Sequence, residues 1–204
     1  TLDDITLATS MVKTPHKEIH IHIESIDGDE FQGKNVHGTP DAVVYAMSSQ
    51  RYTYWSQFCG KKLELGHLGE NLSMDQLDES KFYLGDEYQC GTAVIRATGV
   101  RYPCNRLNFV TGNKKMRDEF LNQNWPGVYF EVVTPGTVKP NDQLLLTKRA
   151  QTIISVLDLY DGLRAAEKKT ISDQQFNELV ESPFLLQKHR DKLYKVTGRI
   201  AKQM

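Results

Sequence analysis

The sequence predicts a mainly β domain over residues 1–150, followed by a small three-helix region over residues 151–204. From about residue 13 to residue 148, short apolar segments lie between turns rich in Gly and Pro, as in a closed β-barrel or a β-sandwich. After about Arg149, apolar residues recur at helical spacing. With 204 residues, 39% of them hydrophobic, the chain can bury one ordinary core and carry a small appendage.

Alternation and turn residues predict the strands of the first region. Residues 19–25 (IHIHIES) alternate with a period of two, and residues 41–47 (DAVVYAM) form a short apolar run. Further strands are expected next to turns that contain Gly85-Asp86, Pro135-Gly136 or Pro140-Asn141, within residues 62–66, 81–100 and 127–149.

Two helices are expected between these strands, and three after them. Residues 48–58 are predicted to be helical with Ser48 or Ser49 as N-cap, and residues 113–124 with an Asn cap. The three later helices are predicted in residues 152–166, in 172–181 with a Ser172/Gln175 capping box, and in 182–198 with Ser182 as N-cap, Pro183 at the first position and Gly198 as the stop.

The three C-terminal helices are short. Leu185, Leu186, His189 and Leu193 are expected to share one face of the last of them. Because helices of this length bury little surface alone, they are expected to pack on the β domain or on a second subunit, so a homodimer is possible.

Composition and motifs exclude several classes of protein. The net charge of −1 without a basic cluster argues against a nucleic acid duplex as partner. No apolar run approaches the roughly 20 residues of a membrane span, and no signal-peptide pattern opens the chain. The commonest hydrolase, kinase and dinucleotide-binding motifs (HExxH, GxSxG, Walker A, GxGxxG) are missing. Three widely spaced cysteines form neither a disulfide framework nor a zinc pair, which indicates a reducing, cytoplasmic location.

One cysteine has unusual neighbours. Cys104 follows Pro103 directly, with Arg101 and Arg106 within three residues on either side. Cations beside a thiol favour its thiolate, the form that binds metals and attacks electrophiles, and the proline suits a rigid loop. The alternative, a small buried hydrophobic residue, is equally compatible with composition alone. Cys59 and Cys90 lack such neighbours and are expected to be structural.

Two further segments carry candidate binding residues. In GHLGENL (66–72), a glycine-rich turn that lets backbone N–H groups approach a ligand precedes Glu70 and Asn71. Asn71 can donate and accept hydrogen bonds at once, which suits a pterin-like edge, although the segment could also be a plain loop. In NVHGTPDAV (35–43), His37 could contact a phosphate or a metal, or be an ordinary surface histidine.

In this order, these segments resemble the motifs of the MOSC domain family, named for the C-terminus of molybdenum cofactor sulfurase, and most closely its YiiM-like branch. The matching motifs are HGTPD (37–41), GENL (69–72), LGD (84–86), RYPCNRLN (101–108) and the closing WPGVYFEVVTPGTVKPND (125–142). The tail after Arg149 is similar to the three-helix region of YiiM-like members, so the resemblance covers nearly the whole chain.

The resemblance implies a closed, barrel-like domain that binds a molybdopterin-type molybdenum cofactor, with Cys104 as catalytic residue and molybdenum ligand. It also implies a set of residues that hold pterin, phosphate or substrate, namely Asn71, Arg101, Arg106, His37 and Glu70. Related proteins reduce N-hydroxylated purines and amidoximes with electrons from a separate reductase, so such a substrate and such a partner are expected here. Pyridoxal phosphate is not expected, because in the sulfurase a separate domain carries it.

The sequence departs from the family pattern at Thr39, Ala42 and Glu131, where the pattern has Gly, Lys or Arg, and Arg. Loss of two cations near a phosphate-bearing ligand weakens its binding, since each charge-assisted contact contributes roughly 1.5–3 kcal/mol. Two alternatives to catalysis therefore stay open. Cys104 could carry a persulfide or deliver the cofactor without turnover, or the domain could only bind partners.

Overall fold

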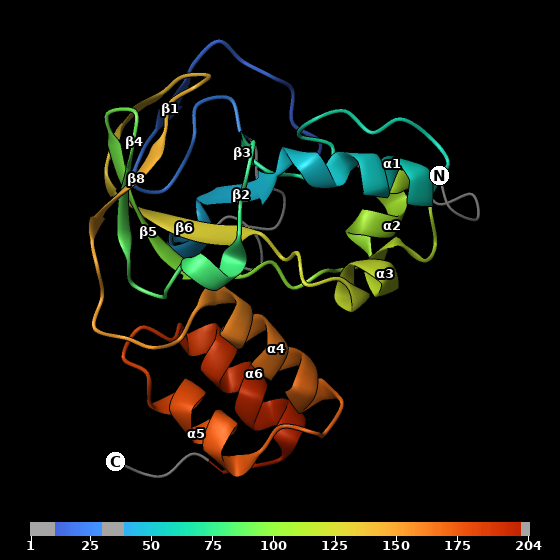
Figure 1. The fold of residues 1–204 in the computed structure, drawn as a ribbon, viewed down its shortest axis with the longest axis vertical. Helices are drawn as coiled ribbons and strands as arrows, with labels where there is room; N and C mark the ends of the chain where they lie inside the picture. The colour runs from blue at the N-terminus through green and yellow to red at the C-terminus, as the bar shows by residue number, and fades with distance from the viewer. Residues whose placement is uncertain (1–10, 30–38, 201–204) are drawn as a thin grey trace.

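The computed structural model describes residues 11–29 and 39–200, which form a curled β-sheet accompanied by six α-helices. The strands are β1 (Ile19–Ile21), β2 (Val44–Ser48), β3 (Leu72–Met74), β4 (Glu87–Cys90), β5 (Ala93–Gly99), β6 (Val128–Thr134), β7 (Gly136–Val138) and β8 (Leu144–Lys148). The helices are α1 (Tyr52–Cys59), α2 (Arg106–Thr111), α3 (Met116–Asn122), α4 (Val156–Glu167), α5 (Asp173–Glu181) and α6 (Gln187–Thr197), with short 3₁₀ helices η1 (Pro40–Ala42), η2 (Ser49–Arg51) and η3 (Glu79–Lys81). Figure 1 shows α1–α3 on one flank of the strands and α4–α6 packed together below them.

The β region is an open half-barrel, which corrects the expected closed barrel. Six strands pair in the order β3-β2-β6-β5-β4-β8, and β1 pairs with β7 in a separate two-stranded sheet. Within the described residues, no ladder joins the end strands β3 and β8, whereas a barrel needs every strand paired on both edges. The terminal strand β3 is only three residues long, and β1 and β7 pair with each other instead of bridging the gap.

Most predicted strands are confirmed, including those around the Gly85-Asp86 turn. The predicted strand in residues 62–66 is wrong, because this segment is irregular and leads into a turn at residues 65–68. The sequence analysis missed the strand that follows this turn, β3, which pairs in parallel with β2.

The predicted helices are confirmed, but several ends differ. Ser48 occupies the N-cap position, as predicted, but of the short helix η2 that precedes α1, and its side chain makes no capping hydrogen bond. The last helix begins at Gln187, because Ser182 instead terminates α5. Ser172 caps α5 by accepting a hydrogen bond from the Gln175 N–H at 3.1 Å, and Gly198 ends α6 with a φ of 69°. Helix α2 was not predicted.

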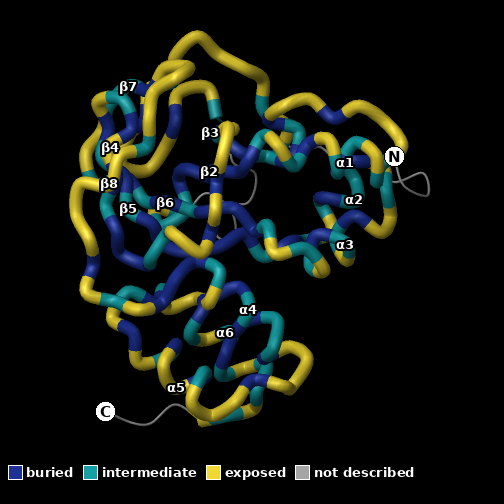
Figure 2. Tube along the Cα trace, in the orientation of Figure 1, coloured by how far each residue is buried: buried dark blue, intermediate teal, exposed yellow. Residues whose placement is uncertain are grey.

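The tail packs on the sheet, as expected for helices that bury little alone. One hydrophobic core contains Ile95 and Phe130 of the sheet together with Val156, Leu159 and Leu163 of α4. Figure 2 shows buried chain running from the sheet into the helices. Because this core is continuous, the boundary between residues 150 and 151 stays a prediction from sequence. A smaller core lies among α1, α2 and α3. Among the described residues, no helix has the length and hydropathy that crossing a bilayer requires.

Helix α6 meets the end of β5 at a glycine. A Cβ on Gly99 would lie 2.5 Å from Cε1 of His189, so only glycine permits this approach. His189, 7% exposed, and buried Leu193 lie on α6 as predicted, whereas Leu185, also buried, and Leu186 precede the helix, so only half of the predicted apolar face is confirmed. Burial, with a further contribution from the Lys188 cation, lowers the pKa of His189 to about 3. Lys192 acts in the same direction and the Asp41 carboxylate opposes it, so His189 is neutral at pH 7.

This burial predicts a loss of stability in acid. An unfolded histidine takes up a proton near pH 6.5, whereas His189 in the folded protein does so only near pH 3, so stability falls as the pH falls between these values. Between pH 7.5 and pH 4.5 we expect the free energy of unfolding of the wild type to fall by about 2–3 kcal/mol more than that of His189→Gln. Urea unfolding of both proteins measures this difference, and the exposed His22→Gln serves as control. Parallel pH curves for wild type and His189→Gln would contradict the assignment.

Candidate functional site

The loop that carries Cys104 joins β5 to α2. Pro103 is buried, Asn105 is exposed, and the thiol-bearing Cys104 between them is partly exposed. The Leu107 N–H donates to the Cys104 carbonyl at 3.1 Å, and this bond opens the first turn of α2. The thiol thus lies in the connection between β5 and α2, just before the first turn of the helix, and is accessible to a ligand.

The side chain of Arg101 lies inside the protein, only 8% exposed. Its Nη1 donates to the Leu68 carbonyl, and its guanidinium lies over the ring of Tyr45 at 5.2 Å and over that of Phe120 at 5.9 Å. Burial pushes the pKa of Arg101 down, but interactions with Tyr45, Tyr129 and Cys104 outweigh burial and raise it.

No carboxylate pairs with Arg101 within the described part of the chain. A buried cation is costly unless other groups compensate its charge. The Leu68 carbonyl and the aromatic faces compensate part of it. Cys104 is close enough to act electrostatically on the guanidinium, so a buried positive charge lies near its sulfur.

Two tyrosines and an aspartate complete this neighbourhood. The rings of Tyr45 and Tyr129 lie 4.9 Å apart. Burial raises the pKa of Tyr129; Arg101 opposes this shift, while Cys104 and Asp41 add to it. The hydroxyl of Thr98 lies within hydrogen-bond distance of the carbonyls of Asp41 (2.5 Å) and Tyr129 (3.1 Å). Of the HGTPD motif, the structure thus places Asp41 near Tyr129, on which Cys104 also acts.

Glu70 and Asn71 hold their own loop. Glu70 is 2% exposed, and its Oε1 accepts hydrogen bonds from the Tyr52 hydroxyl (2.6 Å), the Gly66 N–H (2.7 Å) and the Ser73 hydroxyl (2.9 Å). The Asn71 side chain accepts from the Tyr45 N–H (2.9 Å) and donates to Asp29 (2.8 Å). These contacts give both residues a structural task, and their role in cofactor binding stays a prediction.

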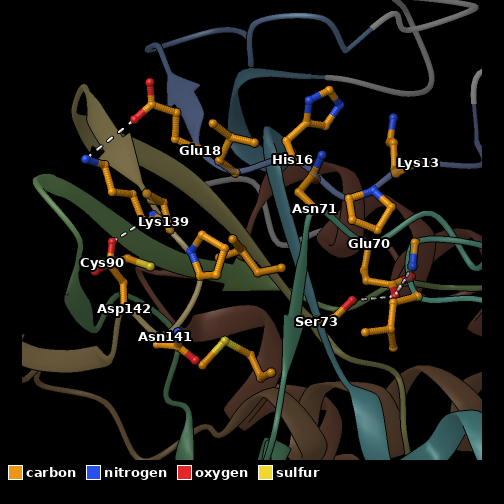
Figure 3. Close-up of a pocket in the computed structure, with 18 of the residues that line it drawn as sticks. Lys13, His16, Glu18, Glu70, Asn71, Ser73, Cys90, Lys139, Asn141 and Asp142 are labelled. Carbon is orange, nitrogen blue, oxygen red and sulfur yellow. Dashed lines mark hydrogen bonds and ion pairs between the residues drawn. The ribbon is translucent and has the colours of Figure 1, made fainter.

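Glu70 and Asn71 also line a cavity of about 250 Å³. Figure 3 shows Asn71, Ser73 and Glu70 on one side of it, and Lys139, Cys90, Asp142 and Asn141 on the other. Among the described residues, those lining this cavity do not include Cys104, Arg101 or Arg106. The predicted site residues thus fall into two groups, connected by the hydrogen bond from Arg101 to Leu68.

The remaining predicted site residues are placed as follows. Arg106 is the first residue of α2 and is partly exposed. His37 lies outside the described residues.

Burial raises the pKa of Cys90 to about 11 and also raises that of Cys59, so these two thiols are protonated at neutral pH, in keeping with a structural role. Glu131, one of the departures from the family pattern, forms an ion pair with Arg96 (2.5 Å) on the sheet.

Sequence reasoning missed Tyr45, Tyr129 and Thr98 as parts of this site. All three lie in or next to strands that were predicted, but strand alternation cannot show which residues lie near a loop distant in sequence. Asp41 is different, because it is the last residue of the HGTPD motif, and this motif was the one sequence signal that pointed to it.

Comparisons with known proteins agree with this architecture. The family model of the MOSC domain matches residues 33–145. Protein YiiM of Escherichia coli is 30% identical over 160 residues, covering 77% of this chain and 70% of YiiM. The Bacillus subtilis protein YflK is 28% identical over 195 residues, covering 92% of this chain and 88% of YflK. The crystal structure of E. coli YiiM superposes with a TM-score of 0.73 at 25% identity, over 91% of this chain and 88% of that one.

The burial of Arg101 predicts a large effect of its removal. Arg101→Met leaves the buried Leu68 carbonyl without its donor, which costs roughly 1–3 kcal/mol of unfolding free energy. Arg106→Met, at a partly exposed position in the same segment, should cost on the order of 0.5 kcal/mol. Urea unfolding compares the two variants. Equal losses would mean that Arg101 does not anchor the loop of residues 66–70.

Proposed function

Because this chain belongs to the MOSC domain family, we propose that it binds a molybdopterin-type molybdenum cofactor, with Cys104 as the molybdenum ligand. The observation that carries the proposal is the partly exposed thiol of Cys104 beside the buried guanidinium of Arg101, which no carboxylate of the described chain neutralises. A charge-compensated thiolate at an accessible position suits a soft metal centre.

The donor set fits a cofactor that brings its own ligands. Residues 11–29 and 39–200 contain no group of three or more His, Cys, Asp or Glu side chains that could hold a metal ion alone. The described residues around Cys104 offer one soft ligand, one buried cation and two phenols, as the burial and charge contacts of Arg101 and Tyr129 show. These groups suit a metal already held by dithiolene sulfurs, for which the protein supplies one further thiolate and a positive charge.

The reaction we propose is reduction of an N-hydroxylated compound, such as an N-hydroxylated purine or an amidoxime. The N–O bond breaks, two electrons and two protons enter, and the amine or amidine and water leave. When bound, the cofactor supplies this two-electron chemistry. The Oη of Tyr129 keeps its proton at neutral pH, because burial raises its pKa, and we propose it as the donor of a hydrogen bond to a substrate oxygen.

The electrons need a separate donor. No flavin, nicotinamide or iron–sulfur motif occurs in the sequence, so we propose a partner reductase in the cytoplasm. Asn71, Glu70, His37 and Arg106 stay candidates for contacts with pterin, phosphate or substrate.

Elemental analysis tests the metal assignment. Wild-type protein expressed in a host that makes the cofactor should contain about one molybdenum per chain. The molybdenum content of Cys104→Ser should be lower by a factor of about ten or more. Cys59→Ser, which changes another partly exposed cysteine, should keep its molybdenum. Reduction of an N-hydroxylated purine with an artificial reductant should follow the molybdenum content across the three proteins.

Two results would contradict the proposal. If Cys104→Ser binds as much molybdenum as the wild type, Cys104 is not the ligand. If mass spectrometry of freshly isolated wild type shows a sulfur adduct on Cys104 and no molybdenum, the chain carries sulfur without turnover, which is the alternative that its partly exposed thiol also permits.

A further inference from the structure

The helical tail contacts the residue two positions before Cys104. The ammonium of Lys192, on α6, lies 3.1 Å from the centroid of the Tyr102 ring. Glu167, the last residue of α4, accepts a hydrogen bond from the Tyr102 hydroxyl and pairs with Lys192 at 2.8 Å. Tyr102, Lys192 and Glu167 thus form a closed triangle, in which each group contacts the other two.

A second contact from α6 reaches the turn that supplies Asp41. Lys188 forms an ion pair with Asp41, and the next residue, His189, packs on Gly99. Asp41 and Cys104 both lie close enough to Tyr129 to help raise the pKa of its hydroxyl. Helix α6 therefore touches both the segment that leads to Cys104 and the turn that carries Asp41.

The charges in these contacts are partly shielded from water. The side chains of Lys192 and Glu167 are 28% and 34% exposed. Burial pushes the pKa of Glu167 up, but hydrogen bonds from Lys192 and Tyr102 outweigh burial and leave it lowered. Burial likewise pushes the pKa of Asp41 up, and Lys188 outweighs it. Both carboxylates are ionised at neutral pH, so the ion pairs hold the tail against the loop with charge as well as with packing.

The loop itself has few other restraints. Residues 100–104 belong to no strand or helix. Arg101 anchors this segment on its inner side, to Leu68, Tyr45 and Phe120. Tyr102 anchors it on the opposite side, to the tail. With neighbouring residues held in opposite directions, the backbone that leads to Cys104 has little freedom.

We propose that the helical tail is part of the Cys104 site, and that Lys192, Glu167 and Lys188 are positioning residues that clamp the segment leading to Cys104 and the turn that carries Asp41. The catalytic value of this clamp rests on the proposed function. The clamp itself can be tested without molybdenum or turnover, so a failure of one proposal is distinguishable from a failure of the other.

The test measures the alkylation rate of each cysteine with the neutral reagent iodoacetamide, by peptide mass spectrometry of the full-length protein. We expect Lys192→Met and Glu167→Gln each to raise the rate at Cys104 about fivefold, as a released loop exposes the thiol more often. Lys188→Met should act in the same direction. Lys192→Arg, which keeps the charge and can stack on Tyr102, should stay near the wild-type rate. Matched controls within the tail are Lys195→Met, an exposed lysine of α6, and Asp173→Asn, which removes an ion pair with Arg199.

The direction in which Lys192→Met changes the alkylation rate distinguishes the clamp from a purely electrostatic effect of Lys192 on the thiol. If Lys192 only added positive potential at the thiol, its removal would slow alkylation of Cys104, whereas Glu167→Gln would speed it. Buried Cys90 reports on general loosening of the fold. A slower or unchanged rate at Cys104 in Lys192→Met, or an equal rise at Cys90, would overturn the proposal.

Discussion

The site depends on one buried cation. Arg101 extends from the Cys104 loop into the protein, donates to Leu68 in the loop of residues 66–70, and stacks on Tyr45 of β2. This side chain fastens three segments that are far apart in sequence. It also places a positive charge behind the thiol where water cannot screen it, because charges interact more strongly in a protein interior than at a surface.

The end of β5 explains why the tail matters. Strand β5 pairs with β4 and β6, but beyond Gly99 residues 100–104 belong to no strand or helix and lose this support. Tyr102 and Gly99 then meet α4 and α6 directly. A three-helix appendage with little core of its own becomes the outer support of the loop. Residues on the tail, far from Cys104 in sequence, would then tune the chemistry at its sulfur.

Sequence reasoning located the Cys104 loop because its motif is local: a proline, a cysteine and two arginines within six residues. It also predicted most strands, since alternation and Gly or Pro turns are short-range signals. It missed the open sheet, because strand closure depends on pairing between β3 and β8, which lie far apart in sequence. Cofactor binding by Glu70 and Asn71 stays a prediction, and the bonds of their side chains to Gly66, Ser73, Tyr45 and Asp29 are contacts that only the fold reveals.

The central claim is that the sulfur of Cys104, with Arg101 behind it, binds molybdenum. X-ray absorption at the molybdenum edge of cofactor-loaded protein tests this directly, because it counts the sulfur atoms around the metal. In the loaded wild type we expect one sulfur around molybdenum beyond those of the dithiolene. A sulfur count that the dithiolene alone explains would show that the cofactor binds without this thiol and would contradict the assignment.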